Sequence, residues 1–169
     1  ASDCAEANGV HTITATNVTF SGGQTTFAGN YNITGTTLVN GGTANLTGNL
    51  TNLGSAVVLT AGTLNLSGSN AEIADYSHTG GTLSGSGLVT LTDSDAQWTA
   101  GAMDGSGVTV NTGTLTLGGL TLKDITARTL RNAVGGTIHW STNTADSGRI
   151  RTGSGATFDN QGLWHDASA

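Results

Sequence analysis

Apolar and polar residues alternate in short runs along this chain. Examples are 89–92 (Val-Thr-Leu-Thr) and 114–117 (Thr-Leu-Thr-Leu). Alternation with a period of two places the apolar side chains on one face of a strand. The pattern predicts many strands of about three to five residues. The best candidate for a helix, residues 122–133, contains Ile125 and Thr126 and suits strands as well.

Glycine-rich turns separate the predicted strands. Glycine supplies the positive φ that a tight corner needs at little steric cost. The predicted corners are residues 21–23, 40–42, 80–81, 105–107, 118–119, 135–136 and 153–155. Asparagines also follow short strands and precede a glycine, at positions 40, 52, 111, 132 and 160. These asparagines predict either left-handed corner residues or a ladder of side chains between stacked units.

The strand and corner unit repeats along the whole chain. Similar segments begin at residues 10, 26, 43, 63, 82, 102, 121, 137 and 157, with a spacing near 19 residues. Such a unit cannot bury its own apolar face, but stacked units share a continuous core. We therefore predict an all-β fold, a parallel β-solenoid of about nine coils that occupies residues 1–169 as a single domain. An antiparallel sandwich is the alternative, although only Asn40-Gly41 fits a two-residue hairpin turn.

Composition and charge narrow the class of protein. The chain of 169 residues has 27 Gly, no Pro, only 9% charged residues and a net charge of -6. Because soluble domains average about 25% charged residues, polar uncharged residues must supply the solubility here. The acidic balance argues against nucleic acid as a partner, and the lack of a run of about 20 apolar residues argues against membrane insertion. Together these features predict an extracellular protein.

The single cysteine, Cys4, cannot form a disulfide within the chain. It is interpreted as a small residue near the end of the solenoid, with pairing to another molecule as the alternative.

The order of motifs in the second half resembles a known family. These motifs are residues 98–107, 129–132, 136–140 and 158–162. They are similar to the repeats of filamentous haemagglutinin and related autotransporter-type adhesin passengers on bacterial surfaces. The resemblance implies a right-handed parallel β-helix, a location at the bacterial cell surface and an adhesive or fibrous role. Its motifs describe coil geometry and carry no catalytic residues.

Because β-helices also include enzymes that cleave glycans, we searched for an acid and base pair. The closest acidic pair is Asp93 and Asp95, which could share one face of a strand and hold a calcium ion. A solvated turn is the simpler interpretation, since calcium requires six to eight oxygen ligands. The sequence thus predicts no enzyme, no catalytic residue, no cofactor and no metal site.

Histidine and aromatic residues are the remaining candidates for ligand binding. His11, His78, His139 and His165 lack the spacing of metal ligands and are expected at the surface or half-buried. The aromatic residues could stack on sugar rings, but packing in the core or at coil ends is expected instead; they are Tyr31, Tyr76, Trp98, Trp140 and Trp164.

The ends of the predicted solenoid suggest a role. Ile150, Phe158, Leu163 and Trp164 lie close to the C-terminus. A contact between unlike ends does not close, so it produces a filament. We predict a fibre subunit or adhesin stalk segment that stacks end to end, with itself or with neighbouring repeats as partner. A carbohydrate-binding module that recognises host or matrix glycans is the alternative, and a glycan-cleaving enzyme is a more distant one.

Overall fold

The computed structural model describes residues 11–141 and 149–167, which form strands and no helix. The strands are β1 (Thr12–Ala15), β2 (Val18–Phe27), β3 (Asn30–Ile33), β4 (Thr36–Leu46), β5 (Asn49–Leu53), β6 (Ala56–Leu66), β7 (Ala71–Ile73), β8 (Tyr76–His78), β9 (Thr82–Ser84), β10 (Leu88–Leu91), β11 (Ala96–Trp98), β12 (Gly101–Asp104), β13 (Val108–Asn111), β14 (Thr114–Leu117), β15 (Lys123–Thr126), β16 (Thr129–Asn132), β17 (Thr137–Trp140), β18 (Ile150–Gly153), β19 (Thr157–Asn160) and β20 (Leu163–Asp166). Residues 122–133 belong to β15 and β16 and the turns beside them, so the strand interpretation of that stretch is confirmed.

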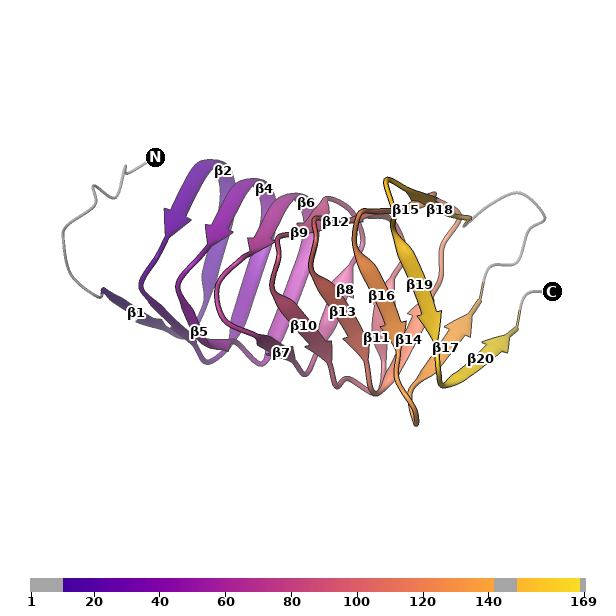
Figure 1. Ribbon diagram of the computed structural model, residues 1–169. Helices are drawn as coiled ribbons and strands as arrows, with labels where there is room; N and C mark the ends of the chain where they lie inside the picture. The colour runs from indigo at the N-terminus through magenta and orange to yellow at the C-terminus, as the bar shows by residue number, and fades with distance from the viewer. Residues whose placement is uncertain (1–10, 142–148, 168–169) are drawn as a thin grey trace.

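The strands wind into a solenoid with three faces (Figure 1). The first face carries β1, β3, β5, β7, β10, β13, β16 and β19 in order, with a break in the hydrogen-bonded ladder between β5 and β7. The second face carries β8, β11, β14, β17 and β20, and the third carries β9, β12, β15 and β18. The long strands β2, β4 and β6 cover both of these faces, and β6 pairs with β8 through one half and with β9 through the other.

Every pairing between neighbouring coils of the described residues is parallel, with register shifts in the pairs β2–β4, β3–β5 and β4–β6, which confirms the predicted parallel β-solenoid. On the first face Thr12 pairs with Asn30 and Val108 pairs with Thr129, steps of 18 and 21 residues. The step from Thr129 to Thr157 is 28 residues, because that coil includes the segment 142–148, which lies outside the described residues. The right-handed turn implied by the family resemblance stays a prediction.

The coil count was overestimated. The segments that begin at 43, 63, 82 and 102 are in register on the third face, so the repeat there is real. The segment at 137, however, begins β17 on the second face, and the segment at 157 begins β19 on the first. The predicted series of nine segments therefore contains strands from different faces, so its members are not all equivalent positions of successive coils. The first face has eight strands among the described residues, fewer than the nine coils predicted.

The core consists of inward-facing side chains stacked in columns along the solenoid. Alternate residues of each strand are buried, as in β14, where Leu115 and Leu117 point inward. One column on the second face contains Val18, Thr37, Val57, Tyr76, Ala96, Leu115, Ile138 and Trp164. Because each inward side chain contacts the one before and after it, the core is continuous along the axis.

The glycine corners are confirmed. Each predicted corner contains a glycine with positive φ, namely Gly23, Gly42, Gly81, Gly105, Gly119, Gly135 and Gly155. The asparagine prediction is resolved in favour of the ladder, since the only described non-glycine residues with positive φ are Ala127 and Ser154. Asn111 Nδ2 donates to Asn132 Oδ1 at 2.9 Å, and Asn132 Nδ2 donates to Asn160 Oδ1 at 2.7 Å. Asn40 and Asn52 do not belong to this ladder.

The described residues contain no helix that is long and apolar enough to cross a membrane.

Candidate interaction surface at the C-terminal end

Asp93 and Asp95, the acidic pair that the sequence offers as a calcium site, lie in a turn between β10 and β11. Asp93 Oδ1 accepts a hydrogen bond from the amide of Asp95 at 2.8 Å, and Asp93 Oδ2 accepts one from the amide of Tyr76 at 3.1 Å. Asp95 Oδ1 accepts from Gln97 Nε2 at 2.7 Å. These bonds fit the turn interpretation, and the described residues contain no group of three His, Cys, Asp or Glu that could hold a metal ion.

The histidines lie in two very different environments. His78 is fully buried, so the expectation of a surface or half-buried position is wrong for it. Its ring stacks on Trp98, which is also buried, with centroids 5.8 Å apart. Tyr76 donates its hydroxyl to His78 Nδ1 at 3.0 Å, and His78 Nε2 donates to the carbonyl of Gly81 at 3.3 Å. Burial lowers the pKa of His78 to about 4, because it disfavours the charged imidazolium.

His139 and His165 occupy paired positions on β17 and β20. Their rings stack with centroids 5.0 Å apart. The sequence did not reveal this contact, since the two residues are 26 positions apart and the repeat is near 19. His11 lies at the exposed start of the described chain, and Cys4 lies outside the described residues.

Two cationic side chains are buried in the interior rather than in a cleft. Lys123 Nζ donates to the carbonyl of Thr121 at 3.3 Å, and burial lowers the pKa of this amine. Arg128 donates to Thr109 Oγ1 and to the carbonyls of Gly85, Gly87 and Asp104. Because these acceptors belong to coils that precede the coil of Arg128, we interpret the arginine as a structural residue that links stacked coils by hydrogen bonds.

The C-terminal end of the solenoid exposes strand edges. β18, β19 and β20 each pair with a strand on only one side within residues 11–141 and 149–167. The opposite edges therefore present main-chain groups that can pair with another parallel strand. Asn160 extends the asparagine ladder to this end, where its Oδ1 accepts from Asn132 Nδ2.

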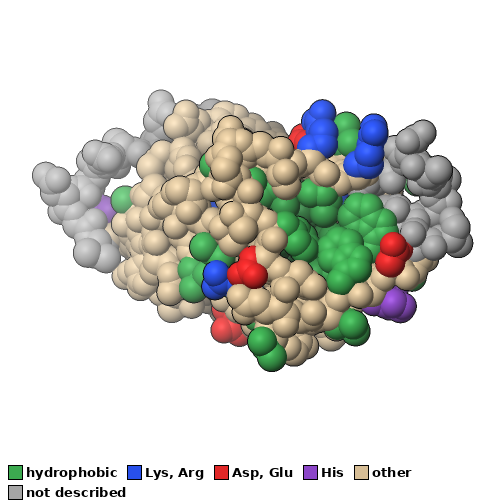
Figure 2. Space-filling model, turned by 45° about the vertical axis from the view of Figure 1, so that its right-hand side comes forward, with side chains coloured by type: hydrophobic (Ala, Val, Ile, Leu, Met, Phe, Trp, Pro, Cys, Tyr) green, Lys and Arg blue, Asp and Glu red, His purple; other side chains and the backbone are tan. Residues whose placement is uncertain are grey.

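Apolar side chains gather at the same end (Figure 2). Trp164 is 38% exposed and stacks on Trp140 at 5.7 Å, while Phe158 packs edge-on against Trp164 at 5.4 Å. Together with Ile150 and Arg149 these three aromatic residues line a hollow of ≈ 420 Å³. Trp98, Tyr31 and Tyr76 are buried in the core. The expectation that the aromatic residues pack in the core or at coil ends is thus confirmed.

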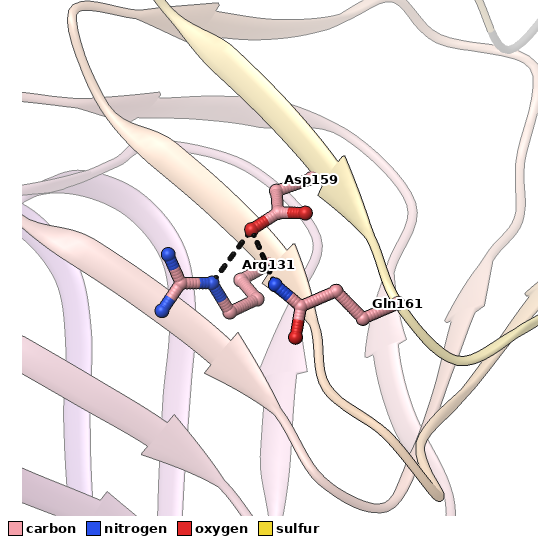
Figure 3. Close-up of polar contacts among 3 residues, drawn as sticks. All are labelled: Arg131, Asp159 and Gln161. Carbon is pink, nitrogen blue, oxygen red and sulfur yellow. Dashed lines mark hydrogen bonds and ion pairs between the residues drawn. The ribbon is translucent and has the colours of Figure 1, made fainter.

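Charged residues attach the last strands to the coils before them. On the first face, Arg131 Nε donates to Asp159 Oδ2 at 2.8 Å, and Gln161 Nε2 donates to the same oxygen at 2.9 Å (Figure 3). On the third face, Arg151 donates twice to Asp124, at 2.7 and 2.9 Å. The hydrogen bond from Arg151 holds the pKa of Asp124 below its usual value. These pairs join β19 to β16 and β18 to β15.

Comparisons with family models, with curated proteins and with solved structures gave no match to this chain.

Proposed function

We propose that this protein is an extracellular structural and adhesive β-solenoid, a fibre subunit or adhesin stalk segment that is extended end to end by further coils. The observation that carries the proposal is the C-terminal end, where free edges of three parallel strands surround an apolar hollow. An apolar surface with unpaired strand edges is the kind of surface that another coil can cover. The partner is a second copy or a neighbouring repeat of the same protein.

Several features support a location outside the cell and a role without catalysis. The resemblance to bacterial adhesin passengers suggests a cell-surface protein. The buried cations and the buried histidine are engaged with main-chain and hydroxyl groups of the core. In this proposal the repeated coil is the functional unit, so neither a cofactor nor a catalytic residue is required.

The test is negative-stain electron microscopy of the full chain across a concentration series, with light scattering on the same samples. The expected result is filaments or end-to-end rods that lengthen with concentration. Trp164→Asp should shorten them, since it places a carboxylate on the apolar end. The matched control is Leu120→Asp, because Leu120 is 61% exposed but lies in the turn before β15 and does not line the apolar hollow. Wild-type rods that never lengthen would contradict the self-stacking form of the proposal.

A glycan-binding module is a second candidate, favoured by one observation. Trp140 and Trp164 lie beside Arg149 around an open hollow, and aromatic rings with a nearby polar group suit the apolar face and hydroxyls of a sugar. Glycan-array screening of the wild type and Trp164→Ala tests it. Saturable binding that is lost in the variant would favour this candidate, because the same hollow cannot hold a glycan and a coil at once.

A further inference from the structure

Two histidines lie next to each other on the outer surface of the second face. His139 of β17 and His165 of β20 occupy paired positions. Their neighbours in sequence, Ile138 and Trp164, belong to an inward column, and side chains alternate along a strand, so both imidazole rings point outward. His165 is exposed and His139 is half-buried. Because the rings face sideways from the coil, their position does not depend on what covers the end of the solenoid.

The ring nitrogens of this pair are not engaged by other polar groups. Within residues 11–141 and 149–167, the two rings stack on each other with an interplanar angle of 23°, and neither ring makes a hydrogen bond or an ion pair. His78, in contrast, is buried and has a hydrogen bond at each ring nitrogen. The nitrogens of His139 and His165 are therefore accessible to a ligand from solvent, while those of His78 are not.

The spacing of the two rings is that of a pair of metal ligands. A tetrahedral zinc ion binds histidine nitrogens at about 2.0–2.1 Å, and the dimensions of imidazole then place two bound ring centroids about 5 Å apart. The centroids of His139 and His165 are 5.0 Å apart. Rotation about χ2, a soft torsion in histidine, turns one nitrogen of each ring toward a common point. Such an ion can therefore bind without a shift of β17 or β20.

The surroundings of the pair favour a cation that prefers nitrogen ligands. The residues that precede His139 in the same outward column are Thr116 and Gln97, so the column places no lysine or arginine against the pair. The whole chain has a net charge of -6, which also favours cations. Imidazole nitrogens suit zinc and related transition metals, whereas calcium and magnesium prefer oxygen ligands.

We propose that His139 and His165 together bind one Zn²⁺ ion on the outer surface of the solenoid. In the described part of the chain no third His, Cys, Asp or Glu joins them to form a larger metal-binding group. The ion therefore has two protein ligands, and its other two positions hold exchangeable ligands such as water, unlike a structural zinc centre with four protein ligands. The inference goes beyond the proposed function, since it requires neither end-to-end stacking nor adhesion.

The experiment is isothermal titration calorimetry of the full chain with Zn²⁺ at neutral pH. All proteins carry Cys4→Ser, because a thiolate is also a strong zinc ligand. His139→Asn and His165→Asn each remove one of two ligands, so we expect either variant to lower the zinc affinity by about tenfold or more. The matched control is His11→Asn, which removes an exposed histidine at the start of the described residues and should leave the zinc affinity unchanged.

A further variant moves the site by one coil. Thr116 of β14 is paired with His139 in the same outward column. Thr116→His combined with His165→Asn therefore recreates two adjacent histidines, now on β14 and β17. We expect this protein to recover the zinc affinity of the Cys4→Ser protein to within about threefold. A purely structural role of His165 would give no such recovery.

The outcomes decide the proposal. Saturable binding of one Zn²⁺ per chain that is weakened in both single variants and recovered by the shifted pair supports the site. No saturable binding in the Cys4→Ser protein, or equally strong binding in His139→Asn and His165→Asn, overturns it. A folded protein with the shifted pair that fails to bind zinc also contradicts it. None of these results bears on end-to-end stacking, which is measured by filament formation.

Discussion

Arg128 Nη1 donates to the main-chain carbonyl of Gly85, 43 residues earlier in the chain, at 3.1 Å. The register of the third face places Gly85 in the next coil after Leu66, in the column of inward side chains that Leu46 and Leu66 fill in earlier coils. In this column Gly85 therefore takes the place that a leucine occupies in the two earlier coils. The buried guanidinium reaches this region and donates to the main-chain carbonyls of Gly85 and Gly87.

Replacing Arg128 should therefore be costly. Arg128→Met removes the guanidinium donors to the carbonyls of Gly85, Gly87 and Asp104 while keeping an apolar stem, although Gly85 still accepts from the amide of Gly107 at 3.0 Å. Buried acceptors left without partners cost about 1–3 kcal/mol each when they cannot reach water, so we expect the free energy of unfolding to fall by about 3 kcal/mol. Urea denaturation followed by circular dichroism measures it. Arg151→Met is the control, because its exposed pair with Asp124 should contribute less than about 1 kcal/mol.

The buried position of His78 makes stability depend on pH. Because burial lowers its folded pKa to about 4 from an unfolded value of 6.5, the unfolded chain binds a proton between these values and the folded chain does not. The contribution of His78 to stability is therefore complete above pH 6.5 and is lost as the pH falls toward 4. We expect a loss of about 1.4 kcal/mol per pH unit across this window.

The His78 prediction is tested by denaturation of the wild type and of His78→Gln from pH 7.5 to pH 4. Glutamine does not titrate, so the difference between the two curves isolates the histidine from the carboxylates that both proteins share. The variant should be less stable at pH 7 and less sensitive to acid. Parallel curves for the two proteins would show that His78 carries the same charge in the folded and unfolded states.

The asparagine ladder offers a comparison between a buried and an exposed position. Asn132 Nδ2 donates to Asn160 Oδ1 at 2.7 Å and to the carbonyl of Leu163 at 3.0 Å. Asn132→Asp replaces this donor with an oxygen, which repels both acceptors inside the solenoid. We expect a loss of about 3 kcal/mol in the free energy of unfolding at pH 7, since a charge is buried with no cationic partner and with the Nδ2 of Asn111 as its side-chain donor.

The same change on the outer surface should be mild. Asn45 donates to Thr26 at 3.3 Å and accepts from Asn65 at 3.0 Å, in a ladder that water can reach. Asn45→Asp should therefore cost less than about 1 kcal/mol. Equal losses for the two variants in thermal unfolding would indicate that burial does not set the strength of the ladder.

The sequence predicted the coil well because its signals are local. Alternation within a strand fixes which side chains point inward, and a glycine corner such as Gly42 is recognised from two or three neighbouring residues. The asparagine ladder was also visible, since Asn111 and Asn132 have equivalent places in their coils. These features require no knowledge of how distant coils are aligned.

Features that depend on the alignment of unequal coils could not be predicted. The stacking of His139 on His165, and of Trp140 on Trp164, needs a step of 26 and 24 residues respectively, outside the spacing of the repeat. The buried Arg128 likewise depends on main-chain carbonyls in two earlier coils, those of Gly85 and Asp104. The apolar residues of the C-terminal end were identified from the sequence. Which strand lies outermost on each face, however, can be stated only when the three faces are known.

The stacked corner glycines should be the least replaceable residues of the solenoid. Gly62 has a φ of 74° and lies on Gly42, whose carbonyl oxygen would be 2.3 Å from a Cβ at position 62. Gly62→Ala therefore meets both backbone strain and a contact with main-chain atoms that cannot move without shifting a coil. We expect a loss of about 3 kcal/mol or more in the free energy of unfolding. Gly22→Ala is the matched control, because a Cβ there would meet nothing within 4 Å and its φ is not in the left-handed region. Urea denaturation of both variants measures the difference, and a Gly62→Ala protein as stable as Gly22→Ala would show that the corner can be rebuilt without glycine.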